Sequence, residues 1–79
     1  MPSASATECV RVLVSFGWMA TSWTEQECLM TKEPSSLIVP LKPELDSSEV
    51  TEIVKRAAIS PIAFVDALEK IRTARLTAS

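Results

Sequence analysis

The spacing of apolar residues predicts a helix near the start of the chain. Between residues 6 and 16, five apolar side chains share one helical face: Cys9, Val10, Leu13, Val14 and Phe16. Thr7 is a candidate cap for the first turn. Gly17 is the only glycine and follows directly. It suits the left-handed residue that ends a helix, where a side chain would cost energy.

Three short strands are predicted next. Residues 18–23 are rich in Trp and Thr and lack helical spacing, residues 25–31 form a second candidate, and residues 37–39 are short and β-branched in part. The stretch 33–36, Glu-Pro-Ser-Ser, is typical of a turn. Because the links are short, we expect neighbouring strands to be antiparallel. Pro40 and Pro43 are expected to end the third strand.

Two further helices are predicted after the strands. Asp46 and Glu49 form a capping-box pattern, and Ser60 followed by Pro61 is typical of a second helix start. The apolar residues at helical spacing are Val50, Ile53, Val54, Ala57 and Ala58 in the first helix, and Ile62, Phe64, Val65, Leu68 and Ile71 in the second, which we expect to end near Ala74. The expected fold is therefore α+β in the order α-β-β-β-α-α, a three-stranded antiparallel sheet with helices packed on one face.

Composition restricts the size and the chemistry. A chain of 79 residues predicts one domain, which we place at residues 6–74, with a disordered stretch at 1–5 and a frayed end at 75–79. There is no histidine, no phosphate-binding glycine motif and no Cys/His metal pattern, so no cofactor is expected. No secretory signal or membrane span is evident, so we expect a cytoplasmic protein with Cys9 and Cys28 as free thiols. One disulfide between them is the alternative.

Charge is distributed unevenly along the chain. Residues 1–54 hold 8 acidic and 3 basic residues, whereas residues 55–79 hold 2 acidic and 5 basic ones. An anionic partner would therefore meet the C-terminal part. The candidate contacts to RNA or to a protein partner are Lys42, Lys55, Arg56, Lys70, Arg72 and Trp23. For the helical cations the alternative is a role in helix stabilisation, and Trp18 is expected in the core.

Residues 50–61 are also similar to the first helix and turn of a DNA-binding helix-turn-helix. The turn has Ala58 where glycine is usual, and the following helix opens with Pro61-Ile-Ala-Phe64, which offers few polar atoms to base edges. This alternative predicts that the segment after Ser60 is exposed.

Two stretches resemble the HicA (YcfA-like) toxin family. Residues 12–18, Val-Leu-Val-Ser-Phe-Gly-Trp, look like that family's first helix running into a glycine and an aromatic residue. Residues 37–45 and 50–64 are similar to its strand ending in Val-Pro, its polar link and its closing helical segment. The resemblance implies a fold like a double-stranded-RNA-binding domain, binding and cleavage of mRNA, and a HicB antitoxin as the partner.

The chain departs from this family at the catalytic position. The resemblance aligns Gln26 with the family's catalytic His, and Lys42 with a second His after the Val-Pro. An amide does not exchange a proton near neutral pH, whereas an imidazole does. We therefore expect a HicA-like domain without ribonuclease activity that binds mRNA or a HicB-like protein, with a homodimer left open. The alternatives are a protein–protein interaction module without a nucleic-acid role and the helix-turn-helix protein.

Overall fold

The computed structural model describes the backbone of residues 1–77 and the side chains of residues 1–74. It confirms the predicted order of elements: α1 (Ala6–Ser15), β1 (Met19–Trp23), β2 (Glu27–Lys32), β3 (Ser35–Pro40), α2 (Ser47–Arg56) and α3 (Pro61–Thr77). The strands form an antiparallel sheet in the order β1-β2-β3. Within the described residues, no helix has the length and apolar character needed to cross a membrane.

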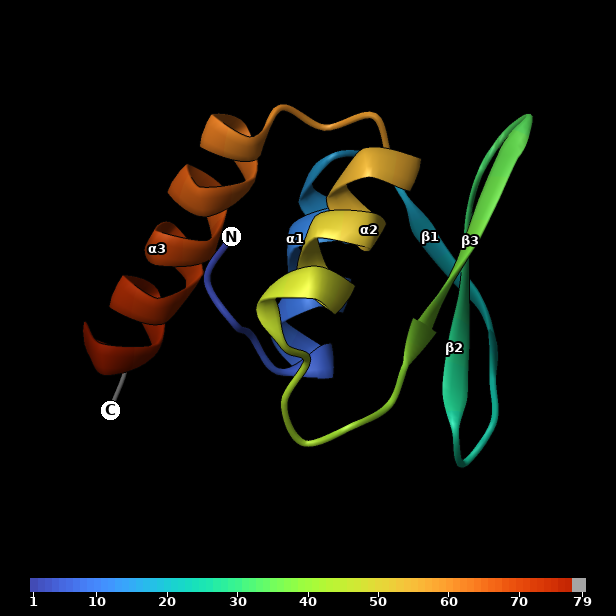
Figure 1. Cartoon of the computed structure of the whole chain (residues 1–79), viewed down its shortest axis with the longest axis horizontal. Helices are drawn as coiled ribbons and strands as arrows, with labels where there is room; N and C mark the ends of the chain where they lie inside the picture. Colours follow the sequence, from blue (N-terminus) through green and yellow to red (C-terminus); the bar gives the residue numbers. More distant parts are fainter. Residues whose placement is uncertain (78–79) are drawn as a thin grey trace.

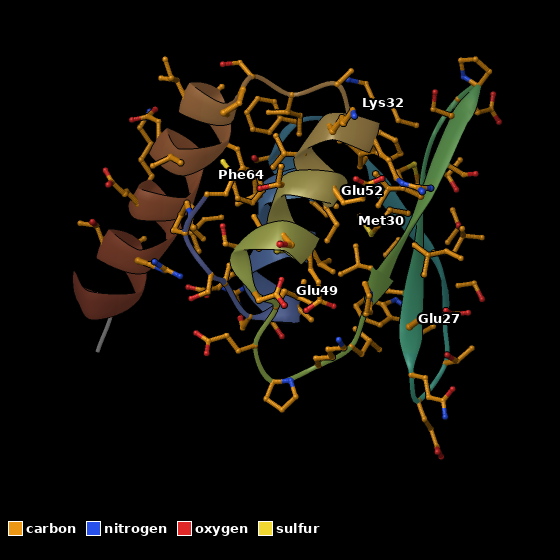
Figure 2. All side chains as sticks on the ribbon, in the orientation of Figure 1. Glu27, Met30, Lys32, Glu49, Glu52 and Phe64 are labelled. Carbon is orange, nitrogen blue, oxygen red and sulfur yellow. The ribbon has the colours of Figure 1, made fainter. Side chains whose placement is uncertain are left out.

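The helices lie on one side of the sheet in two layers (Figure 1). Helices α1 and α2 contact the strands, and α3 packs on α1 and α2 on the side away from the sheet. The core between these layers includes Leu13, Met30, Val39 and Phe64, all fully buried. Phe64 lies between α3 and α2, whereas Met30 lies between α2 and the sheet (Figure 2). The predicted fold class is therefore confirmed, with α3 as an additional outer layer.

The start of α1 differs from the prediction. Ser5, not Thr7, caps the helix: the Ser5 hydroxyl accepts the Glu8 N–H at 3.1 Å, and the Glu8 carboxylate accepts the Ser5 N–H at 2.9 Å. This reciprocal arrangement satisfies two N–H groups that the first turn leaves unpaired. Gly17 has φ +94° and ends the helix as predicted, and the Lys32 ammonium donates to the Phe16 carbonyl beside it at 2.9 Å.

Residues 1–5 were predicted to be disordered, but part of this segment is paired with the rest of the fold. Ala4 is buried and exchanges two backbone hydrogen bonds with Leu45, of 3.2 and 2.7 Å. This pairing holds residues 4 and 5 against the link that precedes α2. At the other end, α3 continues past Ala74 to Thr77, so residues 75–77 are helical rather than frayed; residues 78 and 79 lie outside the described residues.

The predicted caps of the last two helices are present. Asp46 and Glu49 form the capping box of α2, and the Ala63 N–H donates to the Ser60 hydroxyl at 3.4 Å in the first turn of α3. Helix α2 ends at Arg56, and two residues later Ala58, which is not glycine, has φ +56°. The Ala58 N–H donates to the Lys55 carbonyl and the next N–H to the Val54 carbonyl, which is the hydrogen-bond pattern of a glycine-type helix end.

Candidate binding surfaces

Gln26 lies in the loop between β1 and β2, not at the start of a strand as predicted. The Thr24 hydroxyl accepts the N–H groups of Gln26 and Glu27 at 3.2 and 3.0 Å, which closes a tight loop. Glu25 also lies in this loop, so the second strand begins two residues later than the predicted range 25–31. Gln26 is exposed and its carbonyl accepts the Leu41 N–H. The loop contains no imidazole, which is the group that the HicA resemblance places at the catalytic position.

Three of the candidate cations form ion pairs with nearby carboxylates. Lys42 contacts Glu49 at 2.7 Å, Arg56 contacts Glu52 at 3.1 Å, and Lys70 contacts Asp66 at 3.2 Å. The hydrogen bond from Lys42 to Glu49 raises the pKa of the lysine. Each carboxylate offsets the positive potential that a phosphate would meet.

The remaining candidate cations differ in role. Lys55 is exposed on the last turn of α2, where its charge complements the helix dipole. Arg72 donates two hydrogen bonds to the Glu8 carboxylate, at 2.7 and 3.1 Å, and a third to the Ser3 carbonyl at 3.1 Å. The Glu8 side chain is only 10% exposed. Arg72 therefore connects α3 to the start of α1, and its predicted contact with RNA or a protein partner remains a prediction.

The two tryptophans have different environments. Trp18 is buried, as predicted, and its indole N–H has no hydrogen-bond partner. Trp23 ends β1 and is 57% exposed. An exposed indole is a candidate for stacking or for apolar contact with a partner.

Helix α3 has one buried side and one exposed side. Phe64 and Leu68 are buried, whereas Asp66 and Glu69 are exposed on the same helix. Carboxylates facing solvent repel the phosphate backbone of DNA. Burial of Phe64 argues against the helix-turn-helix alternative.

One face of the sheet is left uncovered by the helices (Figure 1). In β2 and β3 its residues alternate with buried ones, and the strand register aligns residues of β1 with them across the sheet. We call this surface the open sheet face; its residues are Met19, Thr21, Ser22, Glu27, Leu29, Thr31, Ser36, Ile38 and Pro40. It contains no Lys or Arg, and Glu27 is its one charged residue.

A groove of about 470 Å³ adjoins this face at the β3 edge, between β3 and α2. We call it the β3–α2 groove. Its lining is Leu29, Ser36, Leu37, Ile38, Pro40, Glu49, Glu52, Ile53 and Arg56. Figure 2 shows Glu52 between α2 and β3. Of the candidates, only Arg56 belongs to this groove.

Both cysteines are free and buried, as predicted. Burial, together with the nearby Glu8 charge, raises the pKa of the Cys9 thiol to about 11, and burial also raises the pKa of Cys28. A neutral, buried thiol is a poor nucleophile, so neither cysteine has the environment of a reactive one. Within the described residues, no group of three or more Cys, Asp or Glu side chains is arranged to hold a metal ion.

The buried thiols predict a loss of stability at alkaline pH. Between about pH 9 and pH 11 the Cys9 thiol ionises in the unfolded chain but stays protonated in the folded one. The unfolded state then binds fewer protons, so the free energy of unfolding falls as pH rises, by about 2 kcal/mol in total. Lys42, whose pKa is raised in the fold, shifts stability in the same direction.

Urea unfolding followed from about pH 8 to about pH 10.5 measures this effect. A Cys9→Ala variant, less stable at neutral pH, should show a shallower decline because it lacks the titrating thiol. Parallel declines in the two proteins would show that Cys9 is not responsible.

No family model, curated protein or solved structure matches the chain. The resemblance to HicA toxins therefore depends on residues 12–18, 37–45 and 50–64 alone.

Sequence reasoning missed the β3–α2 groove. Alternation along residues 35–40 places Ser36 and Ile38 on one strand face, which is visible in the sequence. Which strand forms a free edge, and which helix lies beside it, depends on the order of strands in the sheet.

Proposed function

We propose that this chain is a HicA-like scaffold without ribonuclease activity that acts in the cytoplasm by binding a protein partner. The open sheet face carries the proposal: it is partly apolar and free of Lys and Arg. Apolar surface with little charge is typical of the centre of a protein–protein interface. A HicB-like antitoxin is the partner that the resemblance implies.

RNA binding is the competing role, and charge weighs against it. Proteins that hold RNA without reading its sequence rely on basic side chains along the phosphate backbone. Here Lys42, Arg56 and Lys70 form ion pairs with carboxylates, and Arg72 binds Glu8. The net charge of −2 adds no general attraction to a polyanion.

Titration of fluorescently labelled RNA, both single-stranded and hairpin, separates the two roles. At about 50 mM salt we expect no saturable binding up to about 100 μM protein, and no cleavage of the RNA on prolonged incubation. Binding tighter than about 10 μM that weakens with salt, and that is lost in Lys55→Glu, would establish an RNA-binding role instead. Cleavage that disappears in Gln26→Ala would restore the ribonuclease role.

The protein-binding role also makes a positive prediction. Substitution of Leu29→Lys or Met19→Lys places a charge on the open sheet face without touching the core. A candidate HicB-like partner should bind the native protein and lose affinity for these variants, while Glu69→Lys on α3 serves as the control. Equal affinity for all variants would show that this face is not the interface.

A further inference from the structure

The two edges of the sheet differ in regularity. The β1 edge is interrupted by a bulge between Ala20 and Ser22. The β3 edge pairs with β2 without a shift over all six residues, Ser35–Pro40. Bulges are one of the devices that stop an edge strand from pairing with another chain, and β3 has none along its length.

The phase of hydrogen bonding shows which backbone groups of β3 are free. The Leu41 N–H donates to the Gln26 carbonyl at 2.9 Å, which makes 26 and 41 a hydrogen-bonded pair that continues the β2–β3 register. Hydrogen-bonded and non-bonded pairs alternate along an antiparallel ladder. Leu37 and Val39 therefore bond to β2, whereas the N–H and C=O groups of Ser36 and Ile38 and the C=O of Pro40 face the open edge.

The groove beside this edge accommodates side chains. Ile38 is 51% exposed, and with Leu29, Pro40 and Ile53 it gives the β3–α2 groove an apolar wall. A strand added to β3 would lie about 4.8 Å from it and direct alternate side chains toward this wall. Free backbone groups next to an apolar groove are the features by which proteins bind peptides as an added strand.

The α2 side of the groove favours a basic partner. Glu52 accepts one hydrogen bond from Arg56 through Oε1 at 3.1 Å, and this exposed pair is separated by a single helical turn. Such pairs contribute little stability, so a second cation can compete for the carboxylate. Glu49 is less available, because it caps α2 and binds Lys42.

A second copy of this chain fits the edge less well. In an antiparallel pairing of two β3 strands centred on Ile38, Ser36 would face Pro40, which has no N–H to donate. Each copy would also bring its own Glu52, so that the groove would gain a carboxylate rather than a cation.

We propose that the β3 edge and the β3–α2 groove bind an extended segment of a partner protein as a fourth strand, with apolar side chains against Ile38 and Ile53 and a Lys or Arg beside Glu52. This inference rests on the proposed protein-binding function and names its site and its ligand.

Selection from a displayed library of random peptides of about ten residues provides the probe. We expect enriched sequences with alternating apolar residues and a basic residue. Fluorescence anisotropy with a synthetic copy of an enriched peptide then measures affinity. Methylation of its alternate backbone nitrogens should abolish binding in one of the two registers, because it removes the N–H donors that reach β3 while keeping every side chain.

Two protein variants test the site itself. Ile38→Pro removes an edge N–H that the fold does not use, a position where strands tolerate proline, so it should weaken binding at least about ten-fold with little change in unfolding. Glu52→Lys should weaken binding of the basic peptide about five-fold, and Glu69→Lys should not.

Several outcomes would overturn the inference. The first is that the selection enriches no peptide. The second is that the native protein and Ile38→Pro bind the selected peptide with equal affinity. The third is a concentration-dependent dimer of this chain that Ile38→Pro abolishes. A peptide that loses affinity for Met19→Lys but binds Ile38→Pro normally would place the contact on the open sheet face, because Met19 is not part of the groove lining; the protein-binding function would then stand without this site. Salt-sensitive RNA binding would contradict both the proposed protein-binding function and this peptide-binding site.

Discussion

Phe64→Ala should reduce the free energy of unfolding by about 3–5 kcal/mol. Phe64 is fully buried and lies between α3 and α2 (Figure 2). Truncation removes the apolar contacts of the ring and leaves a cavity that the neighbouring helices fill only in part. Small domains have a total stability of about 5–15 kcal/mol, so this variant should be partly unfolded at physiological temperature.

Urea denaturation followed by tryptophan fluorescence measures the loss, because Trp18 is buried and reports the core. Ile62→Ala is the matched control: Ile62 lies two residues away on α3 and is 83% exposed, so its truncation should cost less than about 0.5 kcal/mol. Similar losses in the two variants would contradict the packing of α3 described above.

Arg72→Ala should cost about 2 kcal/mol of stability. The substitution removes the two hydrogen bonds that the Glu8 carboxylate, which is 10% exposed, accepts from Arg72, and it removes the hydrogen bond from Arg72 to the Ser3 carbonyl. Removing one partner of a buried pair costs about 3–5 kcal/mol, and the 42% exposure of the Arg72 side chain reduces this value. The burial of Glu8 beneath α3 thus decides the size of the effect.

Chemical denaturation of Arg72→Ala beside Lys70→Ala checks this prediction. Lys70 lies two residues earlier on α3 and forms an exposed pair with Asp66, so its loss should cost less than about 0.5 kcal/mol. Equal effects would show that the contact with Glu8 adds nothing to an ordinary surface pair.

A charge reversal at Arg72 would place two carboxylates together, so reduced RNA or partner binding by that variant would reflect unfolding. Lys55 is therefore the better probe of phosphate contacts.

Local signals in the chain predicted the starts of α2 and α3 correctly, whereas β3 begins at Ser35, inside the stretch predicted as a turn. Asp46, Glu49, Ser60 and Pro61 mark helix starts by hydrogen bonds that span only three residues, so their effect is readable without the fold. The start of α1 was misplaced because Ser5 and Thr7 are both suitable caps. The deciding contact is the reach of Glu8 back to the Ser5 N–H, which the sequence also contains as a Ser-x-x-Glu pattern.

The surroundings of the candidate site were only partly predictable. Lys42, Arg56 and Lys70 were predicted as candidate contacts to RNA or to a protein partner, and the fold places a carboxylate beside each of them. The pairs within one helix, Glu52 with Arg56 and Asp66 with Lys70, follow from spacing four residues apart. The contact between Arg72 and Glu8, 64 residues apart, has no local signal.

The sequence by itself determined the three helices, the three strands and their order, because apolar periodicity, caps and turns act over a few residues. It also determined one restriction on the chemistry: with no histidine in the chain, imidazole acid–base catalysis and imidazole metal ligation are not available. Only the tertiary structure decided that β3 forms a free edge beside α2 and that Arg72 binds Glu8. Those features depend on which distant segments pack together, and the free energy of such packing is shared over the whole core rather than carried by any short stretch of chain.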